Sequence, residues 1–334
     1  MLVLAAGFLI VDIIAADLPS VAEPGEVVFA GGGIEVHLGG HPANLSVNLA
    51  KLGIPGSELG VVGAVGGDLF GTFVEETLRG YGIRTFLSKD PSRRTAKNLI
   101  LVVKGEDRRF HVDPGANEAL EPRHVIEVLR KLKPRLFYMA AGLTKLVDRE
   151  LGAVLREAKR LGALTFLDLI KPDEAVRERI RKSLRYVDMM HCNAEEARYL
   201  SGESGLESAI RKLSELGAGL VLVTLGGKGA YLCLQGVKVY QPAFRVKVVD
   251  PTGAGDAFCA GFLRKLYELN GLSKPPSPDV SLLGELLLYA QAVGAIKCTG
   301  VGTTYAVRED AVEMLIEEQG DTIRKQQKVL RSSY

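Results

Sequence analysis

Cysteine is scarce in this sequence, which has four in 334 residues: Cys192, Cys233, Cys259 and Cys298. No two of them form a C-x-x-C pair, which argues against zinc ribbons and thioredoxin-type redox sites. Four cysteines in a chain of this length do not build a disulfide scaffold, so the composition indicates a reducing compartment. We therefore expect a cytoplasmic protein.

An excess of charge of either sign is also missing. Lysine and arginine number 42 and aspartate and glutamate 40, a net charge of +2. No global basic field exists to hold nucleic acid or an anionic membrane, and we expect neither as a partner. No apolar run approaches the roughly 20 residues of a membrane span. The apolar first eleven residues lack a basic start and are followed by Asp12 and Asp17, which predicts a buried strand and not a signal peptide.

Short apolar runs alternate with amphipathic stretches along most of the chain. Hydrophobic residues make up 47% and charged residues 25%, which is ordinary for a globular protein. The alternation predicts an α/β fold: a doubly wound, mostly parallel sheet with helices on both faces, in a single domain over residues 1–334. The expected strands are 2–6, 59–65, 136–139, 165–169 and 220–224, and the expected helices are 42–52, 70–80, 121–132, 147–160, 173–184 and 205–216.

Two segments interrupt this alternation. Residues 13–38 contain extended apolar pieces between glycines, and residues 95–113 have two alternating runs around a Gly-containing turn, the pattern of a hairpin. We expect the two segments to form a small separate β-sheet that acts as a lid over the strand ends of the main sheet. The polar last 20 or so residues predict a terminal helix and a frayed tail.

The segment KVVDPTGAGDAFCAGFL, residues 247–263, carries the clearest chemical signal. Small residues before a helix let backbone N–H groups converge, and with the helix dipole they form an anion site. Asp256 at the same helix start would be a general base that takes a proton from a substrate hydroxyl. The N–H groups of Gly253, Ala254 and Gly255 would neutralise the transferred phosphoryl group. The alternative is a glycine-rich turn with Asp256 as a helix cap. The catalytic interpretation requires that the Asp256 side chain is not packed inside the protein and that an acceptor alcohol can reach it to within about one water.

Two further segments suit a sugar. In GGHPANLSVNLAKLG, residues 39–53, Gly39 and Gly40 allow close backbone approach, and Asn44 faces outward from the first helical turn to bond hydroxyls. The alternative is a glycine turn before a proline-started helix. Asp12 follows the first strand, where ligands of parallel sheets bind, and could hold two hydroxyls of a polyol; otherwise it is an exposed loop acid.

The nucleotide side is indicated by two segments. In HCNAEEARYL, residues 191–200, Asn193 and Glu196 could hold Mg²⁺-bound waters beside phosphates, or they could simply favour the helix start. In VLVTLGGKGAYL, residues 221–232, a strand, a Gly–Gly turn and a strand form a hairpin whose backbone could lie against a nucleotide. The chain lacks a Walker A loop, a G-x-G-x-x-G fingerprint and a G-x-S-x-G elbow. His37 and His41 are spaced i, i+4, but the glycines between them argue against a metal pair.

Together, and in this order, these segments resemble the ribokinase-like carbohydrate kinases of the PfkB family, from about residue 3 to residue 302. The resemblance implies ATP as phosphoryl donor, Mg²⁺, and in some members K⁺ near Asp250 and Thr252. The implied catalytic residues are Asp256, Gly253, Ala254 and Gly255, and the implied substrate-binding residues are Asp12, Gly39, Gly40 and Asn44. The implied nucleotide-binding residues are Asn193, Thr224, Gly226, Gly229 and Thr252. Glu196 would bind the metal through water. Pro251 and Gln291 depart from the commoner family residues.

The substrate is less sharply indicated. A neutral sugar of ribose or ketose type is favoured, a nucleoside is second and a sugar phosphate third. Five basic residues of the lid could clamp a phosphate or could be solvated surface charges: Arg93, Arg94, Lys97, Arg108 and Arg109. A catalytically silent regulator that binds sugar or nucleotide is the alternative of another class. By analogy with other lids, a homodimer formed through this sheet is expected.

Overall fold

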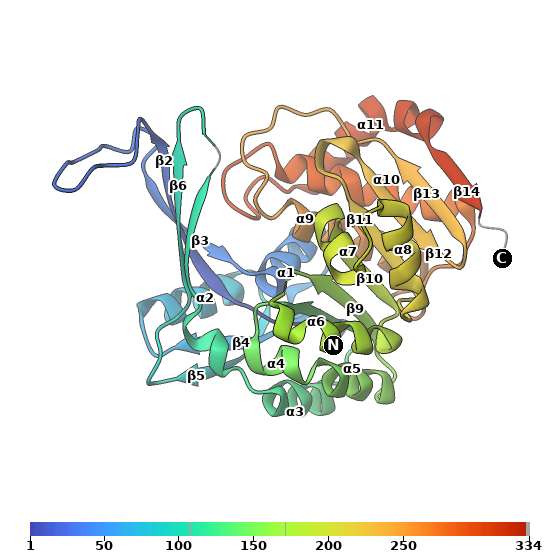
Figure 1. Ribbon diagram of the computed structural model, residues 1–334, viewed down its shortest axis with the longest axis horizontal. Coiled ribbons are helices and arrows are strands. Elements are labelled where there is room, and N and C mark those ends of the chain that lie inside the picture. Colours follow the sequence, from blue (N-terminus) through green and yellow to red (C-terminus); the bar gives the residue numbers. More distant parts are fainter. Residues whose placement is uncertain (107, 171, 332–334) are drawn as a thin grey trace.

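The computed structural model describes residues 1–106, 108–170 and 172–331. Within them, the main sheet has ten strands in the order β14-β13-β12-β11-β10-β9-β8-β1-β4-β5 (Figure 1). The strands from β11 to β5 in this order are parallel, and β12, β13 and β14 are antiparallel. Their bounds are β1 Val3–Ala6, β4 Leu59–Gly66, β5 Arg84–Asp90, β8 Leu136–Ala141, β9 Leu164–Leu169, β10 Met189–Asn193, β11 Leu220–Thr224, β12 Ala230–Leu234, β13 Val237–Gln241 and β14 Lys328–Arg331.

Helices cover both faces of this sheet, so the predicted α/β fold is confirmed. One hydrophobic core joins the sheet to α1, α2, α9, α10 and α11, and a second core joins its other face to α3 through α8. Strands buried on both sides carry nearly continuous apolar sequence, as β1 and β8 do. The bounds are α1 His41–Lys51, α2 Leu69–Gly80, α3 Pro122–Leu132, α4 Lys145–Arg149, α5 Leu151–Arg160, α6 Glu174–Ser183, α7 Ala194–Ser201, α8 Leu206–Glu215, α9 Ala254–Asn270, α10 Val280–Lys297 and α11 Glu309–Gln326.

The predicted lid is present as a four-stranded sheet of order β3-β2-β6-β7. It consists of β2 (Ile10–Leu18), β3 (Ile34–Gly39), β6 (Lys97–Val103) and β7 (Arg109–Asp113), and it projects from the main body at the upper left of Figure 1. The first lid strand begins at Ile10, earlier than the expected boundary at residue 13. Asp12 therefore lies within a lid strand, paired with His37 and Asn98, and not in a loop after the first strand.

The carboxyl-terminal end corrects one expectation. Residues 328–331 form β14, which pairs antiparallel with β13, where the sequence predicted a frayed tail after α11. The hairpin strand β13 would otherwise present an unpaired edge, and pairing satisfies its backbone groups.

Among the described residues, one helix, α10, has the length and composition of a membrane span, with a mean hydropathy of 1.3 over 18 residues. Most of it, 72%, is buried inside the protein, where it packs against α9 and α11. Its apolar composition is accounted for by this position in the core.

Candidate active site

The glycine-rich loop before α9 is tightly packed against residue 303. Gly253 caps the helix with φ 79°, and a Cβ atom here would lie 2.8 Å from the carbonyl oxygen of Thr303. Glycine is the residue that tolerates both the positive φ and the close approach. Glycine at position 253 is therefore required by the backbone path that leads into α9.

The first N–H groups of α9 are only partly occupied. In the described part of the chain, the N–H groups of Gly253, Gly255 and Asp256 donate to no protein acceptor, whereas that of Ala254 donates to the Pro251 carbonyl at 3.2 Å. Free N–H groups at a helix start attract anions. Of the three N–H groups predicted to bind an anion, those of Gly253 and Gly255 are thus available and that of Ala254 is not. The N–H group of Asp256 is available as well.

The side chain of Asp256, in the first turn of α9, contacts two residues in the first turn of α1. Its Oδ2 accepts a hydrogen bond of 2.8 Å from Asn44 Nδ2, and its Oδ1 lies 2.9 Å from Nδ1 of His41, without hydrogen-bond alignment. His41 and Asn44 belong to the first turn of α1, which begins after Gly40 at φ 94°. The side chain of Asp256 caps neither helix, so the alternative of a simple cap is not what the structure shows.

Asp256 is less accessible than its expected role requires. Its side chain is 4% exposed and lies beneath His41, which is 31% exposed. Asn44, expected to face outward, is buried and faces Asp256. The carboxylate is therefore nearly buried, and the His41 ring lies next to Oδ1, the oxygen that a substrate hydroxyl would have to reach.

Asp12 approaches the same region from the lid. It is buried, and its Oδ1 accepts a hydrogen bond of 3.0 Å from Asn98 Nδ2. Gly39 makes room for it, because a Cβ there would lie 2.3 Å from Asp12 Oδ2. Burial raises the pKa of Asp12 to about 6, with the hydrogen bond from Asn98 opposing, and the negative charge of Asp256 contributes to the rise. Of the four predicted substrate residues, Asn44 contacts Asp256, Gly39 packs against Asp12, and Gly40 caps the start of α1.

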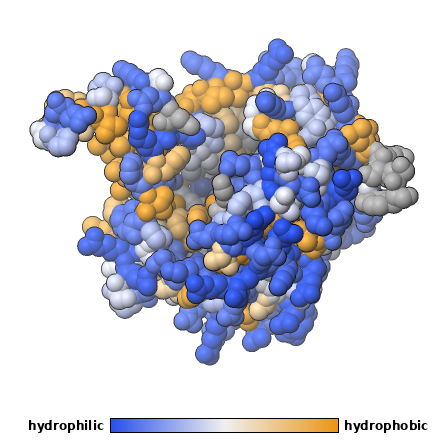
Figure 2. Space-filling view, viewed as in Figure 1, coloured by the Kyte–Doolittle hydropathy of each residue, from blue (hydrophilic) through white to orange (hydrophobic). Residues whose placement is uncertain are grey.

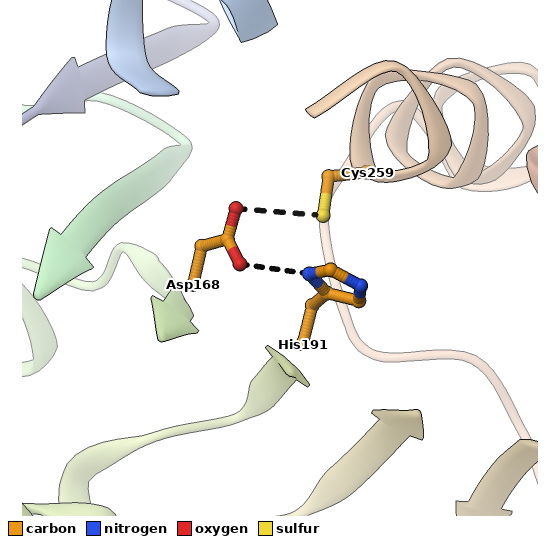
Figure 3. Close-up of side chains that lie close together, drawn as sticks. All are labelled: Asp168, His191 and Cys259. Carbon is orange, nitrogen blue, oxygen red and sulfur yellow. Dashed lines mark hydrogen bonds and ion pairs between the residues drawn. The ribbon is translucent and has the colours of Figure 1, made fainter. Parts of the chain in front are cut away.

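A buried polar network that the sequence interpretation missed lies behind Asp256. Its centre is Asp168 at the end of β9, whose Oδ1 accepts from His191 Nδ1 at 2.7 Å (Figure 3). Oδ2 accepts from Tyr138 Oη at 2.5 Å, from His41 Nδ1 at 3.2 Å and from Cys259 Sγ at 3.8 Å. A buried carboxylate is stable when such donors surround it.

Protonation states follow from this geometry. The His191 and His41 partners hold the pKa of Asp168 below its usual value against the opposing effect of burial. Burial lowers the pKa of His41, but the charges of Asp256 and Asp168 outweigh it and hold this pKa well above its usual value. Burial also opposes protonation of His191, and the charge of Asp168 raises its pKa. We therefore assign protonated, charged rings to His41 and His191 and an ionised carboxylate to Asp168.

Asp168, His191 and Cys259 also have the residue types and proximity of a metal site. Metal binding needs thiolate sulfur, and burial raises the pKa of Cys259 well above its usual value. The neutral thiol acts as a hydrogen-bond donor to Asp168 (Figure 3). The group is accordingly described as a hydrogen-bonded network.

This network reaches from Asp256 to the opposite side of the site. His191 Nε2 lies 3.2 Å from Thr224 Oγ1, so Asp256, His41, Asp168, His191 and Thr224 form a continuous chain of contacts. A carboxylate within the otherwise apolar run LTFLDL was the available sequence signal for Asp168. Nothing in the sequence indicated that His41 contacts Asp256; its i, i+4 spacing to His37 did not predict a metal pair, and His37 pairs with Glu35.

A cavity of about 360 Å³ opens on the side of Thr224. Its walls are mainly apolar, including Phe244, Val246 and Phe258, and Gln291 is a polar exception. The predicted nucleotide residues Asn193, Thr224, Gly226 and Gly229 all line it, together with Ala254 and Gly255 from the start of α9. The predicted nucleotide residue Thr252 is not part of this lining.

Asn193 and Glu196 form a reciprocal cap at the start of α7. Asn193 Oδ1 accepts from the Glu196 N–H at 2.9 Å, and Glu196 Oε2 accepts from the Asn193 N–H at 2.8 Å. The structural alternative for this motif is therefore realised. Burial raises the pKa of Glu196, which also experiences the charges of His191 and Asp168. Asn193 lines the cavity, so the pair remains suitable for contact with waters of a divalent metal.

The proposed potassium region near Asp250 and Thr252 contains protein cations. Lys297 Nζ donates to the Asp250 carbonyl oxygen at 2.5 Å, and Arg108 Nη1 donates to Asp250 Oδ1 at 3.1 Å and to Thr252 Oγ1. A carbonyl and a carboxylate oxygen that could coordinate a monovalent cation already bind an ammonium group. These residues do not suit K⁺, contrary to the expectation.

Most basic residues of the lid are paired with acids. Arg93 pairs with Glu118 and Asp90, Lys97 with Asp113, and Arg109 with Glu106. Because Arg108 is bound to Asp250, four of the five candidate phosphate clamps are engaged.

An apolar cavity that ends at a helix N-terminus, with a carboxylate beyond it, is suited to phosphoryl transfer from a nucleotide.

The sequence model of the pfkB family carbohydrate kinases matches residues 2–310 of this chain. The aminoimidazole riboside kinase of Salmonella typhimurium is 32% identical over 282 residues, which cover 80% of this chain and 84% of the relative. The fructokinase of Klebsiella pneumoniae is 30% identical over 285 residues, covering 80% and 88%. The ribokinase structure from Thermotoga maritima has a TM-score of 0.76 at 27% identity, covering 95% and 99%.

The chain therefore belongs to the pfkB family of carbohydrate kinases. It is an ATP-dependent phosphotransferase for the alcohol group of a carbohydrate or nucleoside.

Replacing Asp12 by asparagine should stabilise the protein in a pH-dependent way. A carboxyl whose folded pKa is raised from 3.8 to about 6 opposes folding once it ionises. This penalty is absent below about pH 4, grows as the pH rises towards 6 and is complete above it. A shift of this size corresponds to about 3 kcal/mol.

Urea denaturation of Asp12→Asn and wild type at pH 4 and pH 8 measures this effect. We expect a higher free energy of unfolding for the variant at pH 8 and only a small part of this gain at pH 4. Asp17→Asn on the same strand, at a site 49% exposed, is the matched control and should change stability by less than about 0.5 kcal/mol at either pH. An equal difference at both pH values would contradict the assignment to Asp12.

Proposed function

We propose that this kinase transfers the γ-phosphoryl group of ATP to a hydroxyl of a ribose- or ketose-type sugar, with Asp256 as general base. The observation that carries the proposal is the position of Asp256 between two sites. Its carboxylate contacts Asn44 and His41 on the lid side, and the adjacent Gly255 lines the apolar cavity. An alcohol and a phosphate held on these two sides would meet at the start of α9.

ATP suits the cavity in chemistry and orientation. Phe244, Val246 and Phe258 offer apolar surface to a nucleobase, and Gln291 offers an amide. The triphosphate would extend towards α9, where the N–H groups of Gly253, Gly255 and Asp256 can donate to the transferred group.

The proton would move to Asp256 as the new bond forms. The substrate O–H gives its proton to Oδ1, its oxygen bonds to the γ-phosphorus, and the bond from that phosphorus to the bridging oxygen breaks to release ADP. His41 is the group that the substrate hydroxyl must displace from Oδ1. The hydrogen bond from Asn44 keeps Oδ2 fixed during this exchange.

Mg²⁺ is proposed to accompany ATP, with Asn193 and Glu196 holding its waters. When bound, the metal neutralises phosphate charge. The cap at the start of α7 fixes both side chains beside the cavity, which supports this assignment.

The engaged charges of the lid favour a neutral sugar over a sugar phosphate. Arg93, Lys97 and Arg109 would each have to leave an acidic partner to bind a phosphate. Buried Asp12 and Asn98, by contrast, offer an acceptor and an amide to polyol hydroxyls.

A nucleoside is the second candidate, supported by the lid face that carries Asp12. Asn98 pairs with Val112 and Ile100 with Phe110, so these side chains share the face of Asp12. Phe110 is 50% exposed and Val112 is 54% exposed, which would suit a flat base. The relative from Salmonella typhimurium is named a riboside kinase.

A coupled ADP-release screen of sugars, sugar phosphates and nucleosides tests the proposal. We expect the highest kcat/KM with a neutral sugar. Release only with nucleosides would select the second candidate, and release only with sugar phosphates would contradict the argument from paired charges. No release with any compound would contradict the proposal.

We also propose a cytoplasmic location. All four cysteines have free thiols, and ATP as donor is consistent with this compartment.

Dimerisation through the lid is a further part of the proposal. Ile13, Val36 and Leu99 share the lid face opposite to Asp12, and hydrophobic side chains are visible on the lid in Figure 2. Ile34, next along this face, is 68% exposed. Such an unpartnered apolar face is typical of an interface between subunits.

The variant Leu99→Lys should abolish this dimer, because it places a charge in the apolar contact. Sedimentation equilibrium should give twice the 36.0 kDa chain mass for wild type and the chain mass for the variant. Met314→Lys, at an exposed position of α11, is the control and should remain dimeric. A wild type that sediments only as a 36.0 kDa species would refute the dimer.

A further inference from the structure

Lys297 is a fully buried lysine at the end of α10. Its side chain has 0% exposure, and its Nζ donates to the Asp250 carbonyl oxygen at 2.5 Å and lies 3.7 Å from Asp250 Oδ2. Lysine is almost never buried without a partner, because the isolated charge is costly to desolvate. Burial lowers the pKa of Lys297, and the Asp250 carboxylate opposes that change.

Asp250 connects this ammonium group to the anion-binding loop. Its Oδ1 accepts from the N–H and Oγ1 of Thr252 at 2.9 and 2.7 Å, and its Oδ2 accepts from the Gly302 N–H at 3.1 Å. The N–H groups of Val249 and Asp250 both donate to the Cys298 carbonyl, at 2.8 and 3.2 Å. The loop that leads to Gly253 is therefore fixed to the end of α10.

The location is favourable for a cation in two ways. The carboxyl-terminal end of α10 has the negative end of the helix dipole, and Asp250 adds a carboxylate and a carbonyl oxygen. A compact ammonium with three donors can satisfy such oxygens directly. Lys297 thus supplies from within the chain the charge that a bound monovalent ion would bring.

We propose that Lys297 acts as a tethered monovalent cation, so that this kinase needs neither K⁺ nor another added monovalent ion. The inference rests on the proposed phosphoryl transfer at Asp256. The ammonium group holds the Asp250–Gly253 loop in the shape that directs the N–H groups of Gly253, Gly255 and Asp256 towards the transferred phosphoryl group. Lys297 is a positioning residue, because it acts through Asp250.

The first test uses wild type and needs no variant. ADP release is measured with tetramethylammonium as the sole monovalent cation and again with K⁺ added, at saturating substrate from the screen. We expect rates that agree within about twofold, since the charge is already present. A tenfold or greater stimulation by K⁺, on the order of the effect of outer-shell groups, would overturn the proposal.

The second test removes the ammonium group. Lys297→Ala leaves space for an ion beside Asp250, and we expect about a 10–100-fold lower kcat in tetramethylammonium, restored by K⁺ or NH₄⁺. Lys297→Met fills the space without a charge and should not be restored. Lys265→Ala, on the partly exposed surface of α9, is the control and should behave as wild type in both salts.

Thermal unfolding gives a readout that is independent of catalysis. K⁺ should raise the Tm of Lys297→Ala relative to tetramethylammonium and leave that of wild type unchanged, because an ion that binds only the folded state stabilises it. A folded Lys297→Ala whose kcat and Tm ignore every monovalent cation would overturn the proposal. Failure of wild type to release ADP from any compound concerns the proposed function, and the Tm comparison still tests Lys297.

Discussion

Replacing Asp256 by asparagine is expected to lower kcat by about 10²–10⁴, the range for loss of a general base. Asparagine has the same shape and can still accept the hydrogen bond that Asn44 donates to Oδ2. It cannot take a proton from the substrate hydroxyl, so the effect should fall on the chemical step. The measurement is ADP release at saturating ATP and sugar.

The affinity for ATP should change little in this variant. The cavity residues are untouched, and the backbone N–H groups at the start of α9 remain, so titration calorimetry should give a Kd close to that of wild type. Asp279→Asn is a matched control, because Asp279 caps α10 and asparagine caps equally well. Equal turnover of Asp256→Asn and wild type would remove the base assignment, and a large loss of ATP affinity would indicate a structural role.

Replacing Asp168 by alanine is expected to lower the free energy of unfolding by about 3–5 kcal/mol, the cost of removing one partner of a buried ion pair. The change deprives His191, His41 and Tyr138 of their common acceptor. Two charged rings would remain beside Asp256 with a cavity between them. Urea denaturation followed by circular dichroism measures the loss.

The stability loss of Asp168→Ala should depend on pH, because the pKa values of Asp168, His41 and His191 are shifted in the folded state. Asp168 has a lowered folded pKa, so its contribution is present above the unfolded value of about 3.9 and is lost as the pH falls. His41 and His191 have raised folded pKa values, so their contribution is complete below the unfolded value of about 6.5 and declines as the pH rises through the folded values. The deficit of Asp168→Ala should therefore be largest between about pH 4 and 6.5.

A surface acid provides the comparison for Asp168. Asp321 is 89% exposed, and Asp321→Ala should change stability by less than about 0.5 kcal/mol at every pH. A deficit in Asp168→Ala that is equally small would show that the network does not stabilise the fold. A large deficit that is independent of pH would assign the loss to packing and not to charge.

The main elements of the fold could be predicted because their signals are local. The alternation of apolar and amphipathic stretches predicted the parallel sheet and its helices, with β11 at its observed bounds. The two interrupting segments predicted the lid, and the small residues before α9 predicted a tight turn at Gly253. Each of these signals depends on a few neighbouring residues, on period and on backbone conformation.

Strand pairing across the chain was not accessible in this way. Residues 328–331 follow a polar stretch near the end of the chain, and they form a strand because β13 offers an edge nearly 90 residues earlier in the chain. Asp12 is in a lid strand because its partners are His37 and Asn98. Pairing with a distant segment supplies the hydrogen bonds that local composition does not indicate.

The motifs alone were enough to place a carboxylate at the start of a helix and glycines where the backbone is close. The apolar strand end expected directly before the loop at Gly253 is wrong, because residues 242–253 form no strand. Which charges face one another was decided by packing. His41, Asp168 and Asp256 come from three different elements, and Lys297 meets Asp250 across 47 residues. The pKa of each group depends on the distances between these elements. So do the burial of Asp256 and the position of the Lys297 ammonium beside Asp250. These distances are fixed only when the helices pack on both faces of the sheet.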